Sequence, residues 1–136
     1  MMISVWTDGA ARPNPGKGGV GIIIRGENWD YTLSKKIDDG KVSSNEAEYS
    51  ALCVALTELM KNNLINHEIT VYSDAELLTL QMSGQKEVDR GGKYVKNYLK
   101  AKEFSEYFTN LRFQWIPREE NTEANMLASK ALKNVF

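Results

Sequence analysis

The stretch that decides the fold covers residues 2–33 and reads MISVWTDGAARPNPGKGGVGIIIRGENWDYTL. It contains three short segments rich in apolar and β-branched residues, which predict three strands. They are residues 2–7, 20–24 and 29–33. Turn-forming residues separate them: Asp8-Gly9 is expected to close the first strand, and residues 14–19 are expected to form the next turn. Because the links are short, the three strands are predicted to pair as an antiparallel meander.

Downstream of residue 42 the apolar positions change to helical spacing, and helices then alternate with strands. The predicted elements are helices over residues 43–62, 75–82, 94–108 and 122–135 and strands over residues 69–73 and 111–116. Right-handed crossovers in the order βββαβααβα place the first, fourth and fifth strands side by side and parallel. The sequence therefore predicts an α/β fold with a five-stranded mixed sheet, an antiparallel meander plus parallel βαβ strands, and helices on both faces.

Length and composition indicate one domain, residues 1–136. Of the 136 residues, 42% are hydrophobic and 26% are charged, which is typical of a domain with its own core. No apolar run reaches the roughly 18 residues of a membrane span, and the N-terminus shows no secretory signal. The single cysteine, Cys53, favours a reducing compartment and is interpreted as a small buried hydrophobe. We therefore expect a cytoplasmic monomer that does not bind membranes.

The charges nearly balance, with a formal net charge of −1, so composition alone does not indicate a nucleic-acid-binding protein. They are unevenly placed, because residues 86–102 hold six basic and only two acidic side chains. A solvated helix face is the default interpretation of such a run.

Three acidic residues are predicted to meet at one edge of the sheet. Asp8 follows the first strand, Asp74 follows the fourth, and Glu48 lies in the first turn of the first helix. Reactive crevices of such sheets lie beyond the carboxyl ends of the parallel strands, where neighbouring strands are roughly 5 Å apart. Like charges this close repel unless a cation lies between them. Carboxylate ligands suit Mg²⁺, and two such ions roughly 3.5–4 Å apart can flank a phosphodiester.

Each acid also has a purely structural interpretation. Asp8-Gly9 can form a turn, and Asp74 can cap the helix predicted from residue 75. Glu48 stands three residues after Asn45 and can complete a capping box. For any one residue the structural interpretation is the stronger, but three acids at the ends of neighbouring elements favour a metal site.

Five motifs extend this pattern in order over nearly the whole chain. They are Thr7-Asp8-Gly9-Ala10, Pro13-Asn14-Pro15-Gly16-Lys17-Gly18-Gly19, Asn45-Glu46-Ala47-Glu48-Tyr49, Tyr72-Ser73-Asp74-Ala75 and Trp115-Ile116-Pro117-Arg118-Glu119-Glu120-Asn121. With these motifs the chain resembles the type 1 ribonuclease H family. The resemblance implies the ribonuclease H-like fold and an endoribonuclease that cleaves the RNA strand of RNA–DNA hybrids with two Mg²⁺ ions, for which Mn²⁺ can substitute. It also implies that Asp8, Glu48 and Asp74 are three of the family's four catalytic, metal-binding acids.

The fourth acid of the family pattern is replaced by Asn125. Asparagine keeps the shape of aspartate and one acceptor oxygen but loses the charge, so the second ion should bind less well and catalysis should be attenuated. Nearby Glu123 points elsewhere around the helix and is a poor substitute for the fourth acid.

Two origins of Asn125 stay open. One is a substitution introduced by experiment, which we favour, and the other is an asparagine encoded by the gene. Two functions stay open as well, an attenuated nuclease and a non-catalytic module that binds RNA–DNA hybrids.

Two sets of residues are candidate contacts to the hybrid. The first set lies in loops that, in the family, follow the minor groove and sense 2′-hydroxyl groups, although turn and cap chemistry also accounts for it. Its members are Asn14, Ser44 and Asn45. The second set is predicted to share one helix face, and the resemblance favours phosphate contacts over mere solvation. Its members are Lys93, Lys96 and Lys100.

A glycine-rich turn, two loop acids and the tryptophans bear on which other activities the chain can have. Gly16-Lys17-Gly18 is not a phosphate-binding P-loop, because Ser or Thr must follow the Gly-Lys pair, so ATP chemistry is excluded. Glu119 and Glu120 are interpreted as exposed loop acids, with a role in proton transfer or product release as the alternative. The tryptophans at positions 6, 29 and 115 are expected to be buried or half-buried on strands.

Overall fold

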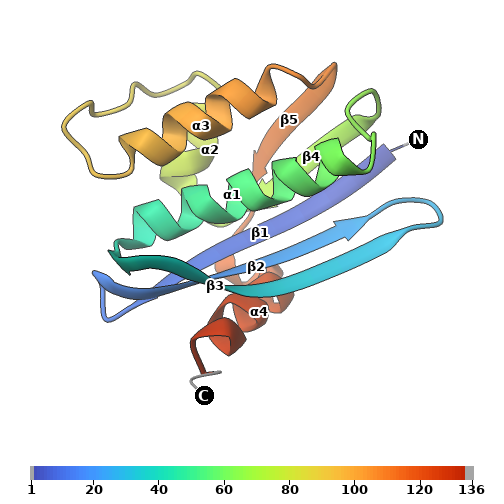
Figure 1. Ribbon diagram of the computed structural model, residues 1–136. Helices are drawn as coiled ribbons and strands as arrows, with labels where there is room; N and C mark the ends of the chain where they lie inside the picture. Colours follow the sequence, from blue (N-terminus) through green and yellow to red (C-terminus); the bar gives the residue numbers. More distant parts are fainter. Residues whose placement is uncertain (1, 134–136) are drawn as a thin grey trace.

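The computed structural model describes residues 2–133, with Asp39 described by its backbone alone (Figure 1). The strands are β1 (Met2–Arg12), β2 (Gly16–Arg25), β3 (Asp30–Val42), β4 (Glu68–Ser73) and β5 (Asn110–Trp115). The helices are α1 (Ser44–Lys61), α2 (Glu76–Met82), α3 (Val95–Ser105), the 3-10 helix η1 (Arg118–Glu120) and α4 (Thr122–Lys133). Within residues 2–133, none of the helices has the length and apolarity needed to span a bilayer.

The five strands form one mixed sheet in the order β3-β2-β1-β4-β5. β1 pairs antiparallel with β2, and β2 pairs antiparallel with β3, as in the predicted meander. β4 lies parallel to β1, and β5 lies parallel to β4. The predicted mixed sheet, with its first, fourth and fifth strands adjacent and parallel, is therefore confirmed.

Helices cover both faces of the sheet, as predicted. α1 packs on β1 and β2 from one side and α3 packs against α1, whereas α4 covers β2, β1 and β3 from the other side (Figure 1). α1 buries Leu52, Leu56 and Leu59 at helical spacing against the fully buried Val5 and Ile22 of the sheet. Burying one such side chain contributes roughly 1.5–3 kcal/mol, so this layer holds α1 firmly in place.

β1 is longer than the sequence pattern predicts. It runs through Asp8-Gly9 to Arg12, and residues 13–15 form the turn to β2 instead of residues 14–19. Both residues of the Asp8-Gly9 pair take part in the antiparallel ladder with β2. The prediction that this pair closes the strand is wrong, because pairing with β2 overrides the local turn propensity.

Other predicted boundaries also differ from those of the structure. β3 continues to Val42, well beyond the predicted end at residue 33. α3 begins at Val95 and ends at Ser105, because the chain on either side of the helix forms turns. α4 is described as far as Lys133, and the predicted continuation to residue 135 lies outside the described residues.

Candidate active site

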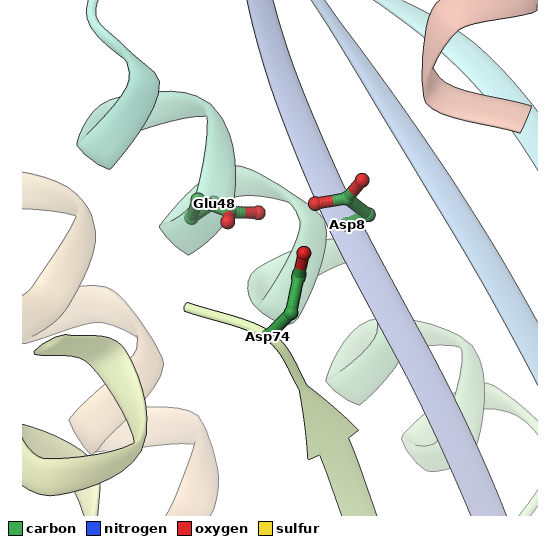
Figure 2. A group of neighbouring side chains, drawn as sticks. All are labelled: Asp8, Glu48 and Asp74. Carbon is green, nitrogen blue, oxygen red and sulfur yellow. The ribbon is translucent and has the colours of Figure 1, made fainter. Parts of the chain in front are cut away.

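Asp8, Glu48 and Asp74 meet where β1 and β4 stop pairing, and their side chains point toward one another (Figure 2). One carboxylate oxygen from each lies within 4.8 Å of the other two. Asp8 comes from β1, Glu48 from α1, and Asp74 directly follows β4. The parallel pairing of β1 with β4 ends at Trp6 and Tyr72. The acids therefore lie beyond the carboxyl end of the parallel ladder, as predicted, although Asp8 itself lies inside β1. We call the three residues the acidic cluster.

Glu48 is placed by α1 and by the absence of a side chain at Gly9. The backbone N–H of Gly9 donates a hydrogen bond to Glu48 Oε1. A Cβ atom at Gly9 would lie 2.3 Å from the carbonyl carbon of Ala47, so only glycine lets α1 pass this close to β1. Glu48 lies in the second turn of α1, not the first, and the capping box is made by Ser43 and Glu46. The interpretation of Glu48 as a capping residue is therefore wrong.

Asp74 is held by side chains from two other segments. Its Oδ1 accepts a hydrogen bond from Asn121 Nδ2 at 3.1 Å, and its backbone carbonyl accepts one from Trp115 Nε1 at 3.3 Å. Asp74 does not cap α2, whose N-cap is Ala75, so this structural interpretation is wrong too. Trp115 is 44% exposed, more than the buried or half-buried environment expected for it, because it lies on the edge strand β5. Trp6 and Trp29 are half-buried, as expected, although Trp29 lies just before β3 and not on a strand.

Asn125 reaches the acidic cluster from α4, on the face of the sheet opposite to α1. Its Nδ2 donates a hydrogen bond to Asp8 Oδ2 at 2.8 Å. Gly21, which pairs with Asp8 in the ladder, makes this approach possible, because a Cβ atom there would lie 2.1 Å from the carbonyl oxygen of Ala124. Asn125 thus lies beside the acids, and its match to the fourth acid of the family pattern remains a prediction from the sequence.

Glu123, the acid nearest to Asn125 in the sequence, points elsewhere. It forms an ion pair with Arg25 at 3.0 Å, and the Arg25 guanidinium lies over the ring of Trp6. Glu123 is therefore paired away from the acidic cluster, in line with its predicted orientation on the helix.

The carboxyl groups of Asp8 and Glu48 resist ionising together. Burial raises the pKa of Glu48 well above its ordinary value of 4.5, and repulsion from Asp8 raises it further. Burial also raises the pKa of Asp8, with repulsion from Asp74 adding to the effect, whereas the hydrogen bond from Asn125 lowers it. Hard oxygen ligands that repel one another are the donor set that suits Mg²⁺ or Mn²⁺. The residues present therefore fit a divalent cation.

The first set of candidate hybrid contacts is brought together at the start of α1. Asn14, in the turn between β1 and β2, accepts a hydrogen bond through Oδ1 from the backbone N–H of Ser44 at 3.0 Å. Asn45 follows in the first turn of α1 and is exposed. These residues form one surface, one helical turn away from Glu48.

The second set lines a groove between β3, α1 and α3, which we call the lysine groove. Lys93, Lys96 and Lys100 all line it. Lys93 precedes the first residue of α3, so the prediction of a shared helix face is wrong for this lysine. Lys35 and Lys36 of β3 line the same groove. Sequence reasoning missed this pair because the predicted strand ended at residue 33.

A five-stranded mixed sheet in this order, with helices on both faces and an acidic cluster beyond β1 and β4, defines a ribonuclease H-like protein. The chain also matches the family described as "Reverse transcriptase-like" over residues 6–131, and it belongs to that family. The resemblance to type 1 ribonuclease H is thereby confirmed, since relatives named ribonuclease HI match the same chain.

Three relatives show the extent of the similarity. "Bifunctional protein Rv2228c" of Mycobacterium tuberculosis is 32% identical over 133 residues, which are 97% of this chain and 36% of that protein. The crystal structure of RNase H1 from Halobacterium salinarum superposes with a TM-score of 0.87 at 26% identity, covering 99% of this chain and 100% of that one. LC11-RNase H1, solved in complex with an RNA/DNA hybrid, has a TM-score of 0.85 at 34% identity over 95% of each chain. The chain thus spans only 36% of the length of its mycobacterial relatives.

Proposed function

We propose that the chain is an endoribonuclease that cleaves the RNA strand of RNA–DNA hybrids. The observation that carries the proposal is the acidic cluster, in which three carboxylates from three elements have ligand oxygens within 4.8 Å of one another. Burial raises the pKa of Asp8 and Glu48, repulsion from neighbouring carboxylates raises it further, and bound cations relieve that repulsion. Family membership and the similarity to a protein solved with an RNA/DNA hybrid support the choice of substrate.

The acidic cluster is the proposed site of two divalent ions. Asp8, Glu48 and Asp74 would hold them, with Asn125 as a neutral fourth neighbour. Bound Mg²⁺, or Mn²⁺ in its place, supplies Lewis acidity at the scissile phosphate and lowers the pKa of a bound water. The chain's own contribution is to orient the carboxylates: the N–H of Gly9 holds Glu48, and the side-chain amide of Asn125 holds Asp8.

Asn125 is proposed to slow the reaction. Three carboxylates and one phosphate bring about four negative charges to the site, and the family arrangement adds one more from its fourth acid. Two Mg²⁺ ions would therefore meet one negative charge fewer here than in the family arrangement, and the second ion would be held less tightly. The amide of Asn125 also points its Nδ2 at Asp8, so it must turn round before its oxygen can face a cation.

Two surfaces beside the acidic cluster are proposed to hold the hybrid. Asn14, Ser44 and Asn45 form the surface that contacts the minor groove, where 2′-hydroxyl groups mark the RNA strand. The lysine groove is proposed to contact backbone phosphates, because it gathers five lysines along one depression.

A second candidate function is a non-catalytic module that binds RNA–DNA hybrids. The hydrogen bond from Asn125 Nδ2 to Asp8 Oδ2 favours it, because a neutral donor occupies the place of an acid and engages one Asp8 oxygen. Such a protein keeps both hybrid-binding surfaces but does not hydrolyse the RNA.

Cleavage of a hybrid with a 5′-labelled RNA strand separates the two functions. The chain is incubated with the hybrid in Mg²⁺, in Mn²⁺ and in EDTA, with single-stranded RNA of the same sequence as the substrate control. Ion-dependent cuts confined to the hybrid, and lost in Asp74→Asn, support the nuclease. Tight hybrid binding with no cuts in either ion supports the binding module, and cuts that persist in Asp74→Asn contradict the proposed site.

We also propose that residues 1–136 act as a single ribonuclease H domain, and that this domain works as a monomer in the cytoplasm without ATP. Light scattering coupled to size-exclusion chromatography tests the monomer directly. A mass of twice 15.4 kDa would contradict it.

A further inference from the structure

Asn121 connects the strands that carry the acidic cluster. Asn121 is 2% exposed, and its Nδ2 donates two hydrogen bonds. One goes to the backbone carbonyl of Thr7 at 2.9 Å and the other to Asp74 Oδ1 at 3.1 Å. Thr7 immediately precedes Asp8 on β1, so one amide group bridges β1 and the end of β4 where their backbone pairing has stopped.

The main chain of Asn121 links this bridge between β1 and β4 to α4. Its carbonyl oxygen accepts a hydrogen bond from the N–H of Asn125 at 3.1 Å, in the first turn of α4. Asn125 in turn donates to Asp8. The positions of Asp8 and Asp74 are therefore coupled through this one residue.

The orientation of the Asn121 amide follows from its partners. The carbonyl of Thr7 and the carboxylate of Asp74 are both acceptors, so the NH₂ group must face them. Its Oδ1 is then left buried, with no hydrogen-bond partner in the part of the chain that the structure describes. A buried acceptor without a partner destabilises a fold. Fold stability alone therefore does not account for an asparagine at this position.

We propose that Asn121 is a positioning residue for metal binding. Its amide engages one oxygen of Asp74 and keeps this carboxylate turned toward Asp8 and Glu48, which leaves the second oxygen for a cation. Without the amide, Asp74 can adopt other rotamers, and part of the ion-binding energy is then used to order it. The inference rests on the proposed function, because it takes Asp74 as a metal ligand.

A double-mutant cycle on Mn²⁺ affinity tests the inference without any cleavage assay. Mn²⁺ binding is measured by electron paramagnetic resonance of the free ion for the parent, Asn121→Ala, Asp74→Ala and the double variant. Asn121→Ala is expected to weaken binding roughly 10- to 100-fold, and to have little effect when Asp74→Ala is already present. If Asn121→Ala does not fold, Asn121→Leu, which keeps the side-chain volume but has no donor, replaces it in the cycle.

Gln81→Ala is the matched control. Gln81 is also 2% exposed and its side chain makes three hydrogen bonds, to Tyr49, Tyr94 and the backbone carbonyl of Glu87, but none to the acidic cluster. It is expected to lower the Tm while leaving the Mn²⁺ affinity unchanged.

Two results would overturn the inference. One is equal weakening by Asn121→Ala in the parent and in Asp74→Ala, which shows an effect on the fold rather than on Asp74. The other is an Asn121→Ala chain that binds Mn²⁺ as tightly as the parent. A parent that binds no Mn²⁺ contradicts the proposed metal site and this inference together. A parent that binds Mn²⁺ and shows the coupling but cuts no hybrid contradicts only the nuclease function.

Discussion

At the scale of single residues, the neutral amide of Asn125 leaves the site with three carboxylates. Asn125 donates to Asp8 instead of adding a carboxylate. We predict that Asn125→Asp raises Mg²⁺-dependent hybrid cleavage by orders of magnitude, because an anionic ligand strengthens binding of the second ion. A tenfold change needs only about 1.4 kcal/mol. Initial rates on a labelled hybrid measure the gain, and Mn²⁺, which tolerates neutral ligands better, should partly rescue the parent.

Asn125→Ser is the control for this prediction, because it changes the side chain without adding charge, and it should give no gain. If Asn125→Asp gives no gain with either ion while the hybrid still binds tightly, the non-catalytic module becomes the better description.

Crowding of the acids also makes stability depend on pH. Burial raises the pKa of Glu48 in the folded protein, so the folded chain keeps this proton at pH values where the unfolded chain has released it. The contribution of Glu48 to stability is therefore fully present below its ordinary pKa of 4.5 and is lost as the pH rises through the raised value. Urea unfolding in EDTA between pH 5 and 8 should show this decline, and added Mg²⁺ should reduce it.

Glu48→Gln is the matched variant for the pH experiment. Its amide oxygen can still accept the hydrogen bond from Gly9, but it carries no titrating proton. The variant should show a flatter pH dependence than the parent and greater stability at pH 8. If stability declines equally steeply with pH in both proteins, groups other than Glu48 cause the decline.

At the scale of elements, the site depends on how closely α1 passes over β1. We predict that Gly9→Ala destabilises the protein by roughly 1–3 kcal/mol and weakens Mn²⁺ binding. The added Cβ would overlap the backbone of Ala47, so α1 must move, and Glu48 moves with it. Urea unfolding and Mn²⁺ titration measure the two effects. Gly91→Ala is the control, because a Cβ there meets only Asp89 Oδ1 at an ordinary 3.5 Å. Comparable losses in both variants would contradict this account.

The lysine groove is tested at the same scale, because three elements contribute to it. We predict that replacing Lys93, Lys96 and Lys100 with Ala weakens hybrid binding and flattens its salt dependence. Each lost phosphate contact should lower the magnitude of the log–log slope by about 0.9. Fluorescence anisotropy of a labelled hybrid between 50 and 200 mM salt, a range in which roughly six contacts change affinity by orders of magnitude, gives the slope.

The control for the groove is a set of lysines on other surfaces, at the end of α1 and on α4. Its members are Lys61, Lys130 and Lys133. Their replacement leaves the same net charge as the test variant but should change the slope much less. Equal slopes for the two variants would show that the groove lysines are solvated and do not contact the phosphates.

At the scale of the whole molecule, most of the architecture could be predicted because its signals are local. Short apolar segments between turn residues predicted the meander, and apolar spacing over α1 predicted the helix. Chain order and crossover handedness then predicted which strands are parallel. Asp8 and Asp74 could be placed together for the same reason, since both lie beyond the end of the parallel pairing.

The features that sequence reasoning missed depend on contacts between distant segments. Asp8-Gly9 has the composition of a turn, and only pairing with β2 and the close pass of α1 keep it in a strand. Asn121 was visible only as the end of a motif, because its side-chain partners Thr7 and Asp74 lie 114 and 47 residues away. Lys35 and Lys36 reach the groove only because β3 continues beyond its predicted end.

The placement of Asn125 on α4 has a consequence for the order in which the site is assembled during synthesis. All three acids lie within the first 74 residues, whereas β5 and α4 follow after residue 109. Because chains emerge from the ribosome N-terminus first, the acids are made well before the amide that donates to Asp8. The nascent chain therefore carries all three acids before the amide that donates to Asp8 exists, and the site is still open on the face that α4 later covers. Docking of the last helix closes it.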